Sequence, residues 1–317
     1  GFSPVKNLYA RLGSKSPNFM FAGHVDIVPP GNMKDWTVNP FKPSIKNGHL
    51  IGRGANDMKS SVAAFVSAIS TFLSKNEKIN GSISLLITGD EEGDAVNGTK
   101  KVVEYLKKRK ERINFCLVGE PTNPNKLGEM IKIGRRGSIT GKIKIIGEQC
   151  HVAYQYRGNN PSTTLVQILK EIKDIKFDKG NKHFQPTNLE VTKINIKNDA
   201  DNVIPGSAEA TFNIRFNNRH SSNSIKRRLN KIFKKITKKN KSKFKIDYRV
   251  SGEAFLTTPN KTTFLIQNII KKITKLKPKL STTGGTSDLR FIRKISPGLE
   301  FGLVGKTMHK VDEAVSL

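Results

Sequence analysis

Cysteine, tryptophan and acidic residues are all scarce in this chain of 317 residues. It has two cysteines and one tryptophan, and only 26 Asp and Glu stand against 56 Lys and Arg. Two cysteines are too few for a disulfide scaffold. Cys116 lies in the apolar run NFCLVG and is expected to be a buried core residue, so a reducing, cytoplasmic compartment fits best.

Long apolar runs are also absent. No stretch approaches the roughly 20 apolar residues that a membrane-spanning helix needs, so we expect no membrane partner. The 36% hydrophobic and 26% charged residues are typical of a soluble globular protein, and the length allows two domains. The chain opens at Gly1 without an initiator Met, so we expect a fragment or a processed chain, with any upstream targeting segment left open.

The excess of cations gives a net charge of 56 − 26 = +30, which is typical of nucleic-acid-binding proteins. The lysines, however, are spread along the whole chain. No aromatic-rich RNA motif, zinc finger or Gly-Lys phosphate loop accompanies them in the sequence. We therefore expect no nucleic-acid partner and favour a small acidic molecule as the substrate.

Short apolar runs and helical patterns alternate in the first third of the chain. Buried strands are expected at residues 18–26, 82–88 and 114–119. Apolar residues with helical spacing follow Asp57 and recur over residues 99–110. This alternation predicts an α/β sheet with parallel strands.

The pattern changes at about residue 138. Alternating strands are expected at residues 139–146, 189–196, 208–216 and 243–250, with helices near 162–175 and 222–236. Two strand–helix–strand units of this kind predict a small α+β sandwich. After Gly252 the α/β character returns, with a helix near residues 262–276 and a strand at residues 299–304. We therefore expect a catalytic domain of residues 1–137 and 251–317, interrupted by an inserted domain of residues 138–250.

Six residues in short, distinctive segments are candidates for one metal site. The segments are AGHVDIVPP, GRGANDMKS, ITGDEEG, LVGEPT and KTMHKVDE, and the residues are His24, Asp57, Glu91, Glu92, Glu120 and His309. Zn²⁺ accepts imidazole nitrogen and carboxylate oxygen as ligands, and a further glutamate beside a ligand glutamate can act as the general base of a hydrolase. Several of these residues follow apolar strands, and open α/β sheets place their sites at the carboxyl ends of strands.

Taken singly, the same residues also have structural interpretations. His24 and Asp26 are two apart on a strand end, so the carboxylate can accept a hydrogen bond from the imidazole and fix its tautomer. Asp57 could instead cap the helix that follows it. Glu91 and Glu92 could form an ordinary solvated turn. Residue by residue, the sequence leaves both interpretations open.

Together the segments closely resemble the dinuclear zinc aminoacylase and glutamate carboxypeptidase superfamily. The matching segments span residues 23–313 and are HVDIVPPG, WTVNPF, GRGANDMKS, LLITGDEEG, NGTKKVVE, LVGEPT, KIGRRGS, HVAY, NVIPG, FNIRF, TTGGTSD, RFI and HKVDE. They look most like the desuccinylase branch, which cleaves N-succinyl-L,L-2,6-diaminopimelate in bacterial lysine and diaminopimelate biosynthesis. The resemblance implies an α/β, zinc-peptidase-like catalytic domain with a mixed, largely parallel sheet, interrupted by an α+β lid and dimerisation domain.

The resemblance also implies a metal set. One metal would take His24, Asp57 and Glu120, and the other would take Asp57, Glu92 and His309, with Asp57 as the bridge. Two Zn²⁺ are expected, and Co²⁺ or Mn²⁺ could substitute for them. The Asp57–Met58 peptide is expected to be cis.

Further roles follow from the resemblance alone. Asp26 would orient His24, Glu91 would be the general base, and His151 would reach into the partner subunit's site in a homodimer. The residues expected to bind the acylated amino-acid substrate or to shape the closed site are Arg135, Tyr154, Asn202, Arg215 and Thr286.

Four positions depart from the family pattern, namely Cys150, Leu289, Asp94 and Asp312. The resemblance also places the family's opening helix and first strand before Gly1.

The nearest alternative function is that of a related deacylase, such as acetylornithine deacetylase. A non-catalytic basic binding protein on the same fold is the alternative from another class. The complete ligand set with Glu91 argues against a binding protein, because such a protein needs no general base.

Overall fold

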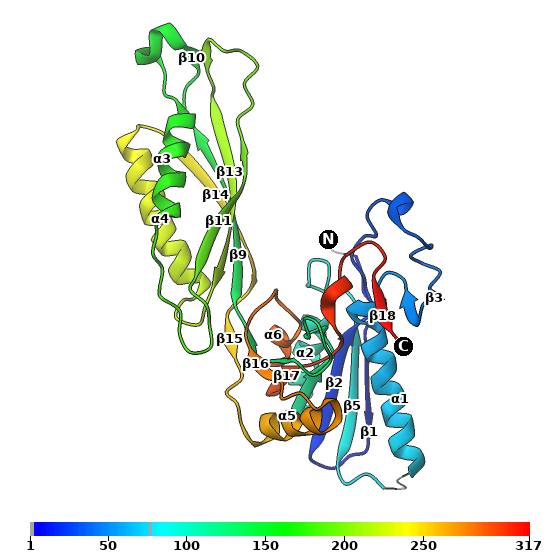
Figure 1. Cartoon of the computed structure of the whole chain (residues 1–317). Coiled ribbons are helices and arrows are strands. Elements are labelled where there is room, and N and C mark those ends of the chain that lie inside the picture. Colours follow the sequence, from blue (N-terminus) through cyan, green and yellow to red (C-terminus); the bar gives the residue numbers. More distant parts are fainter. Residues whose placement is uncertain (1–2, 76–77) are drawn as a thin grey trace. The chain divides into compact units, whose positions relative to one another are not determined.

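The computed structural model describes residues 3–75 and 78–317 (Figure 1). The chain divides into two compact units. Unit 1 comprises Gly1–Gly134, Thr257–Ser281 and Ser287–Leu317, and unit 2 comprises Arg135–Leu256 with Thr282–Thr286. The main part of unit 2 is therefore inserted between the first two parts of unit 1, and Thr282–Thr286 lies between the second and the third.

A seven-stranded sheet forms the centre of unit 1. Its strands, in spatial order, are β1 (Leu8–Leu12), β5 (Ser82–Thr88), β2 (Asn18–His24), β6 (Phe115–Val118), β17 (Gly298–Glu300), β7 (Met130–Lys132) and β16 (Lys279–Ser281). The neighbours from β5 to β17 run parallel, as do β7 and β16, whereas β1 pairs antiparallel with β5 and β17 with β7. The predicted mixed, largely parallel sheet is confirmed.

Helices and a small sheet complete unit 1. The helices are α1 (Ser60–Lys75), α2 (Thr99–Lys108), α5 (Lys261–Thr274) and the short α6 (Leu289–Ile292). The three-stranded sheet has the order β18 (Ala314–Ser316), β4 (His49–Ile51) and β3 (Ser44–Lys46). Helix α1 begins at Ser60 and not directly after Asp57, because Asp57 and Met58 have non-helical backbone angles. The strand expected at residues 299–304 is limited to β17.

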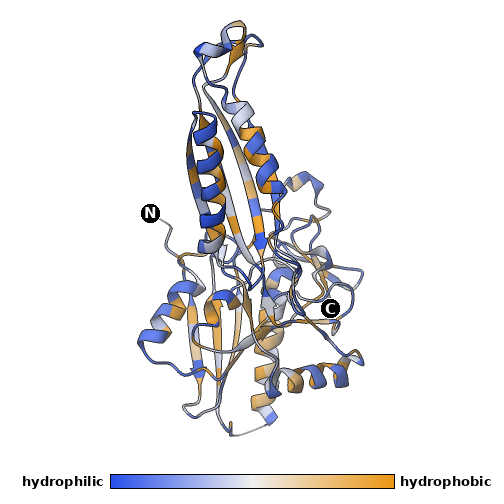
Figure 2. Cartoon of the chain, turned by 90° about the vertical axis from the view of Figure 1, so that its left-hand side faces the viewer, coloured by the Kyte–Doolittle hydropathy of each residue, from blue (hydrophilic) through white to orange (hydrophobic). Residues whose placement is uncertain are grey.

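Unit 2 is built on a four-stranded antiparallel sheet. Its order is β11 (Asn188–Asn195), β13 (Ser207–Phe216), β9 (Gly137–Ile146) and β14 (Lys243–Gly252). Helices α3 (Pro161–Lys173) and α4 (Ser222–Lys239) pack against it through one core that includes Ile143, Phe212 and Phe233. Each helix carries an apolar and a polar stripe (Figure 2), as expected for helices that cover one face of a sheet. The predicted strands and helices of this region are confirmed.

Two short ladders lie at opposite ends of β9. At its start, β8 (Gly134–Arg135) pairs with β15 (Phe255–Leu256). Beyond its end, β10 (Cys150–His151) pairs with β12 (Val203–Ile204) and leads into a turn of 3₁₀-helix (Val152–Arg157).

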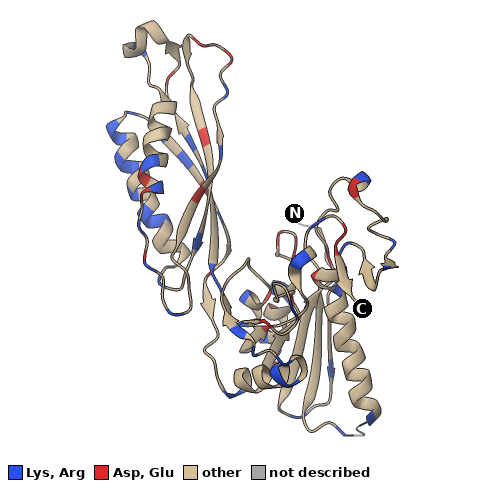
Figure 3. Cartoon of the chain, viewed as in Figure 1, with Lys and Arg blue, Asp and Glu red and all other residues tan. Residues whose placement is uncertain are grey.

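The cations are spread over both units and are dense on α4, whose sequence contains no acidic residue (Figure 3). Within residues 3–75 and 78–317, no helix has the length and apolar character needed to cross a membrane.

Candidate metal centre

The candidate ligands meet at the carboxyl ends of β2 and β6. His24 is the last residue of β2, and Glu120 follows two residues after the end of β6. The Nε2 atom of His24 lies 3.2 Å from Asp57 Oδ1 and 3.9 Å from Glu120 Oε1. Because β2 and β6 are parallel neighbours, their ends bring both residues to the same edge of the sheet.

The carboxylate of Asp57 lies between two histidines. Its Oδ1 atom faces His24, and its Oδ2 atom lies 3.1 Å from His309 Nε2. The same His309 nitrogen lies 2.8 Å from Glu92 Oε1. An aspartate whose two oxygens face different histidines can serve two cations at once.

Gly23 in β2 and Gly119, directly after β6, leave room for Met58, the residue that follows Asp57. Met58 is fully buried, and its methyl group occupies the space that a Cβ atom on Gly23 or Gly119 would need. Gly54 begins the turn with a φ of 81°, a left-handed conformation that glycine adopts without cost. The Asp57–Met58 peptide is cis, so that prediction is confirmed.

The loop that carries Glu91 and Glu92 is held by two other carboxylates. Asp90 has a φ of 62°, and its side chain accepts hydrogen bonds from the backbone of residues 95–97. Asp26 Oδ2 accepts a hydrogen bond of 2.9 Å from the Glu92 amide. The sequence analysis predicted that the Asp26 carboxylate would orient His24, and it did not predict this hydrogen bond with the Glu92 amide.

The predicted contact between His24 and the Asp26 carboxylate is present but long, and the main-chain oxygen of Asp26 lies nearer to the imidazole. The Nδ1 atom of His24 lies 3.1 Å from the main-chain oxygen of Asp26 and 3.5 Å from its Oδ1 atom. The Glu92 amide donates its hydrogen bond to Oδ2, and Oδ1, which faces the imidazole, has no hydrogen-bond partner of normal geometry among the described residues. Both the main chain and the side chain of Asp26 therefore face the imidazole, and the side chain also supports the loop of Glu91 and Glu92.

Glu91 points into the same cluster and has a cation beside it. Its side chain is largely buried, and Arg290 Nη1 lies 3.3 Å from Glu91 Oε1. Burial raises the pKa of Glu91 to about 8, the charge of Asp288 adds to this rise, and the Arg290 guanidinium opposes it. Asp288 is itself buried and accepts hydrogen bonds from Thr88 and Thr99.

Sequence reasoning missed Arg290 and Asp288. Both lie in the segment TSDLRFI, which carried the family resemblance, but nothing in the segment points to Glu91. The contact joins residues 199 positions apart, so only the folded chain reveals it.

The ionisable groups of the cluster shift one another's pKa values strongly. Burial alone would raise the pKa of Asp57, but hydrogen bonds with His24 and His309 lower it to about 2. Burial would lower the pKa of His24, and interactions with Asp26 and Asp57 instead raise it to about 12. Hydrogen bonds with Asp57 and Glu92 raise the pKa of His309 to about 10.

The pKa of Glu120 shifts in the direction opposite to that of Asp57. Burial raises its pKa well above the ordinary value, and the charges of Glu91 and Asp57 raise it further. These shifts favour protons on the two histidines and on Glu120, where they would offset the negative charge of the cluster. A divalent cation supplies the same balance and competes with protons for the same atoms.

Two sets of donor atoms lie close enough to share an ion, within 4.8 Å of one another. They are His24, Asp57 and Glu92 in the first set, and His24, Glu91 and Glu120 in the second. The buried acids and the mixture of imidazole and carboxylate fit divalent transition metals. The residues present are therefore a suitable donor set for the expected cations.

In unit 2, the predicted substrate residues fall into two groups. Arg135 donates a hydrogen bond to the Thr283 backbone, in the segment that leads to Thr286, and Arg215 pairs in register with Ser138 at the start of β9. At the other end of β9, His151 pairs with Val203 in the β10–β12 ladder, next to Asn202. Tyr154 is half exposed, with its ring centroid 5.8 Å from that of His151.

The departures from the family pattern have structural partners. Leu289 is fully buried and packs against Gly298. Asp312 accepts hydrogen bonds from the amide and hydroxyl of Thr37. Cys150 is a free thiol, and its sulfur occupies the space that a Cβ atom on Gly158 would need. None of these three side chains takes the place of a candidate ligand.

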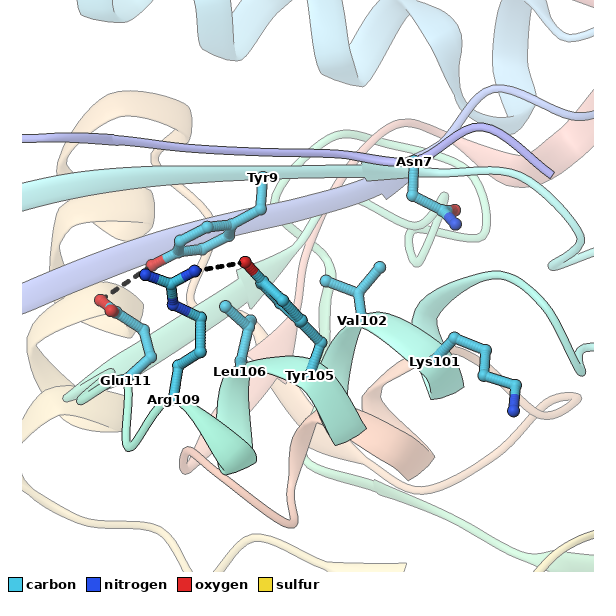
Figure 4. A pocket seen from close by; sticks show the side chains of 8 residues that line it. All are labelled: Asn7, Tyr9, Lys101, Val102, Tyr105, Leu106, Arg109 and Glu111. Atoms are coloured by element: carbon cyan, nitrogen blue, oxygen red, sulfur yellow. Dashed lines mark hydrogen bonds between the residues drawn. The ribbon is translucent and has the colours of Figure 1, made fainter.

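A separate hollow of about 520 Å³ lies between β1 and α2 (Figure 4). Tyr9 and Arg109 line it, with Tyr9 donating a hydrogen bond to Glu111 and Arg109 donating one to Tyr105. None of the candidate metal ligands lines this hollow.

Comparison with known proteins gives strong similarities over the whole chain. A succinyl-diaminopimelate desuccinylase of Pelagibacter ubique is 76% identical over 314 residues, which cover 99% of this chain and 82% of the relative. The corresponding enzyme of Parvibaculum lavamentivorans is 51% identical over 99% of this chain and 79% of its own length. The resemblance to desuccinylases inferred from the motifs is confirmed.

A solved structure shows the same fold at low sequence identity. An M20 family metallo-carboxypeptidase from Sulfolobus solfataricus matches 100% of this chain and 85% of its own with a TM-score of 0.77 and 18% identity. The family description "Peptidase family M20/M25/M40" matches residues 20–317. With this match over nearly its full length, the chain belongs to the M20/M25/M40 peptidase family.

Proposed function

We propose that the chain is a metal-dependent amidohydrolase that cleaves N-succinyl-L,L-2,6-diaminopimelate to succinate and L,L-diaminopimelate. The observation that carries the proposal is the convergence of donors from separate segments around Asp57, with Glu91 beside them. The 76% identity to a desuccinylase supports this choice of substrate. The reaction belongs to lysine and diaminopimelate biosynthesis, and we place it in the cytoplasm.

His24, Asp57 and Glu120 would hold one cation, and Asp57, Glu92 and His309 would hold the second. When bound, two such cations supply an activated water and polarise the carbonyl that is attacked. Zn²⁺ is the proposed ion, because the donors are imidazole and carboxylate, and Co²⁺ or Mn²⁺ would fit the same donors.

Glu91 carries the proton in this mechanism. Its carboxylate accepts a proton from the attacking water while the water oxygen forms a bond to the succinyl carbonyl carbon. Glu91 then delivers this proton to the amine nitrogen as the C–N bond breaks, so that succinate and the free amine leave. Arg290 donates a hydrogen bond of 3.3 Å to one oxygen of Glu91, which holds the carboxylate in place for this transfer.

The position of His151 supports a homodimer with shared sites. The ten-residue strand β9 separates Arg135 from His151, and at about 3.3 Å per residue it is roughly 30 Å long. One small substrate cannot touch both residues of the same chain. We therefore assign Arg135, Arg215 and Thr286 to the substrate of their own chain, and His151 with Asn202 to the partner's site.

Tyr154 belongs with the second group. Its ring lies near His151, and the guanidinium of Arg157 lies 4.9 Å from its ring centroid. This exposed cluster presents an imidazole donor together with aromatic surface, as a lid that closes over a partner's substrate requires.

Metal binding should raise the melting temperature of the chain. A cation that binds only the folded state stabilises it by about 2.7 kcal/mol at a free concentration of 100 times its Kd. Thermal unfolding of chelator-treated protein, with and without added Zn²⁺, measures the shift. Mg²⁺ is the control, because it prefers oxygen ligands in octahedral geometry and should stabilise the chain less. An equal shift in the Asp57→Asn variant would contradict the assignment of Asp57.

The substrate is tested by measuring succinate released from N-succinyl-L,L-diaminopimelate and acetate released from N-acetylornithine. We expect metal-loaded protein to release succinate and little acetate. Preferential acetate release would favour a related deacylase, and no release of either product would favour a binding protein. The chelator-treated chain is the matched control in both assays.

A further inference from the structure

Glu313 lies at the centre of a hydrogen-bond network that holds the turn before Asp57. The Oε1 atom of Glu313 accepts hydrogen bonds of 2.8 Å from the amides of Asn56 and Asp57. Its Oε2 atom accepts one of 3.0 Å from the Gly54 amide and one of 2.8 Å from Arg53 Nη1. The residue is 1% exposed, so this carboxylate is fully enclosed by its donors.

A buried negative charge of this kind is stable only when it is paired and hydrogen-bonded. Arg53 supplies the opposite charge, is itself buried, and lies over the ring of Trp36 at 5.0 Å from the ring centroid. The backbone amides supply the remaining hydrogen bonds. Each Glu313 oxygen therefore receives two donors, which fixes the orientation of the carboxylate and of the turn.

The segment that contains Glu313, residues 304–314, connects two candidate ligands. His309 precedes Glu313 by four residues, and its ring contacts Asp57 directly. The Asn56 side chain donates hydrogen bonds to the main-chain oxygens of Val304 and Ala314, on either side of this segment. Residues 304–314 thus bring one ligand to Asp57 and hold the backbone of the other.

We infer that Glu313 is a positioning residue that sets the direction of the Asp57 carboxylate, and so the affinity of the shared metal site. The inference rests on the proposed function, in which Asp57 would be a ligand of both cations. Among the described residues, the hydrogen bonds of the Glu313 carboxylate come from Arg53 and from backbone amides, one of them the Asp57 amide, and not from a candidate ligand side chain. It is therefore distinct from the ligands and from the general base.

The test is Glu313→Gln, which keeps the shape of the side chain. The amide group of Gln would bring N–H donors against at least two of the four existing donors, so two hydrogen bonds are lost and the turn must shift. Supporting partners of metal ligands typically contribute about 10–100-fold to metal affinity. We expect a loss of this size in Zn²⁺ affinity, measured by competition with a chromogenic chelator.

Glu111→Gln is the matched control. Like Glu313, Glu111 is a carboxylate of unit 1 that accepts a hydrogen bond from an arginine, here Arg11, but it is only partly buried. It also accepts a hydrogen bond from Tyr9 and lines the hollow of Figure 4. We expect this variant to lose thermal stability while it keeps the Zn²⁺ affinity of the unmodified chain. A loss of affinity in both variants would show that general destabilisation is the cause and would overturn the inference.

Two further outcomes separate the inference from the proposed function. If the unmodified chain does not bind Zn²⁺, the proposed function fails. If the unmodified chain binds Zn²⁺ and Glu313→Gln binds it equally well, the inference fails alone.

Should Glu313→Gln not fold, amide hydrogen exchange in the unmodified chain replaces it. We expect the Asn56 and Asp57 amides to exchange slowly both with and without metal, because their acceptor is Glu313. Rapid exchange in the metal-free chain would overturn the inference.

Discussion

Glu91→Gln is expected to lower kcat by about 10²–10⁴-fold, the usual contribution of general acid–base catalysis. An amide has nearly the shape of the carboxylate but can neither accept nor return a proton at neutral pH. Zn²⁺ content should remain that of the unmodified chain. The measurement combines steady-state succinate release with metal analysis of the same sample.

Glu92→Gln provides the contrast for this prediction. Glu92 contacts His309 Nε2 at 2.8 Å, whereas Glu91 contacts Arg290, so the two adjacent acids have different partners. We expect Glu92→Gln to weaken one metal site. Equal metal loss in the two variants would show that the roles of base and ligand are wrongly assigned, particularly because Glu91 also lies within reach of an ion shared with His24 and Glu120.

His151→Ala is expected to lower kcat by about 10²–10³-fold, the usual cost of removing one oxyanion donor. Metal content should not change, since His151 lies in unit 2 while every candidate ligand lies in unit 1. The side chain is exposed, and its Nδ1 atom accepts a hydrogen bond from the Ala153 amide. With Nδ1 as the acceptor, the neutral imidazole carries its proton on Nε2, which is the donor that the proposed role requires.

Mixing His151→Ala with Glu91→Gln tests whether the histidine acts across the dimer. In a heterodimer, one site combines an intact Glu91 with an intact His151 from the other chain. Random exchange in a twofold dimer restores about one quarter of all sites. Activity that stays at the level of the separate variants, after exchange is verified by mass spectrometry, would rule out action in trans.

Local patterns in the sequence were enough to predict the positions of the strands that carry the candidate site. The apolar runs that became β2, β5 and β6 could be placed because buried parallel strands are short and continuously apolar. In unit 2 the alternation of β13 and the helical spacing of α4 were equally clear. Strands of three residues, such as β7 and β16, escaped detection because they are too short to show a period.

The candidate ligands could also be identified before the structure was known. His24, Asp57 and Glu120 lie in segments whose order resembles that of one family, and short motifs of this kind carry much of the chemistry. Their supporting residues could not be identified in this way. The Asp26 contact with the Glu92 amide, and the choice of the Asp26 main-chain oxygen as partner of His24, depend on loop geometry.

The sequence by itself determined the α/β class, and it predicted the inserted unit and the candidate donors, because periodicity and short motifs are local properties. The tertiary structure alone decided which donors face one another and what holds them. His309 meets Glu92 across 217 residues, and the Asp57 amide meets Glu313 across 256. Such contacts form only in the folded chain. Almost every residue has the same backbone amide, so the sequence does not indicate which acceptor a given amide will find.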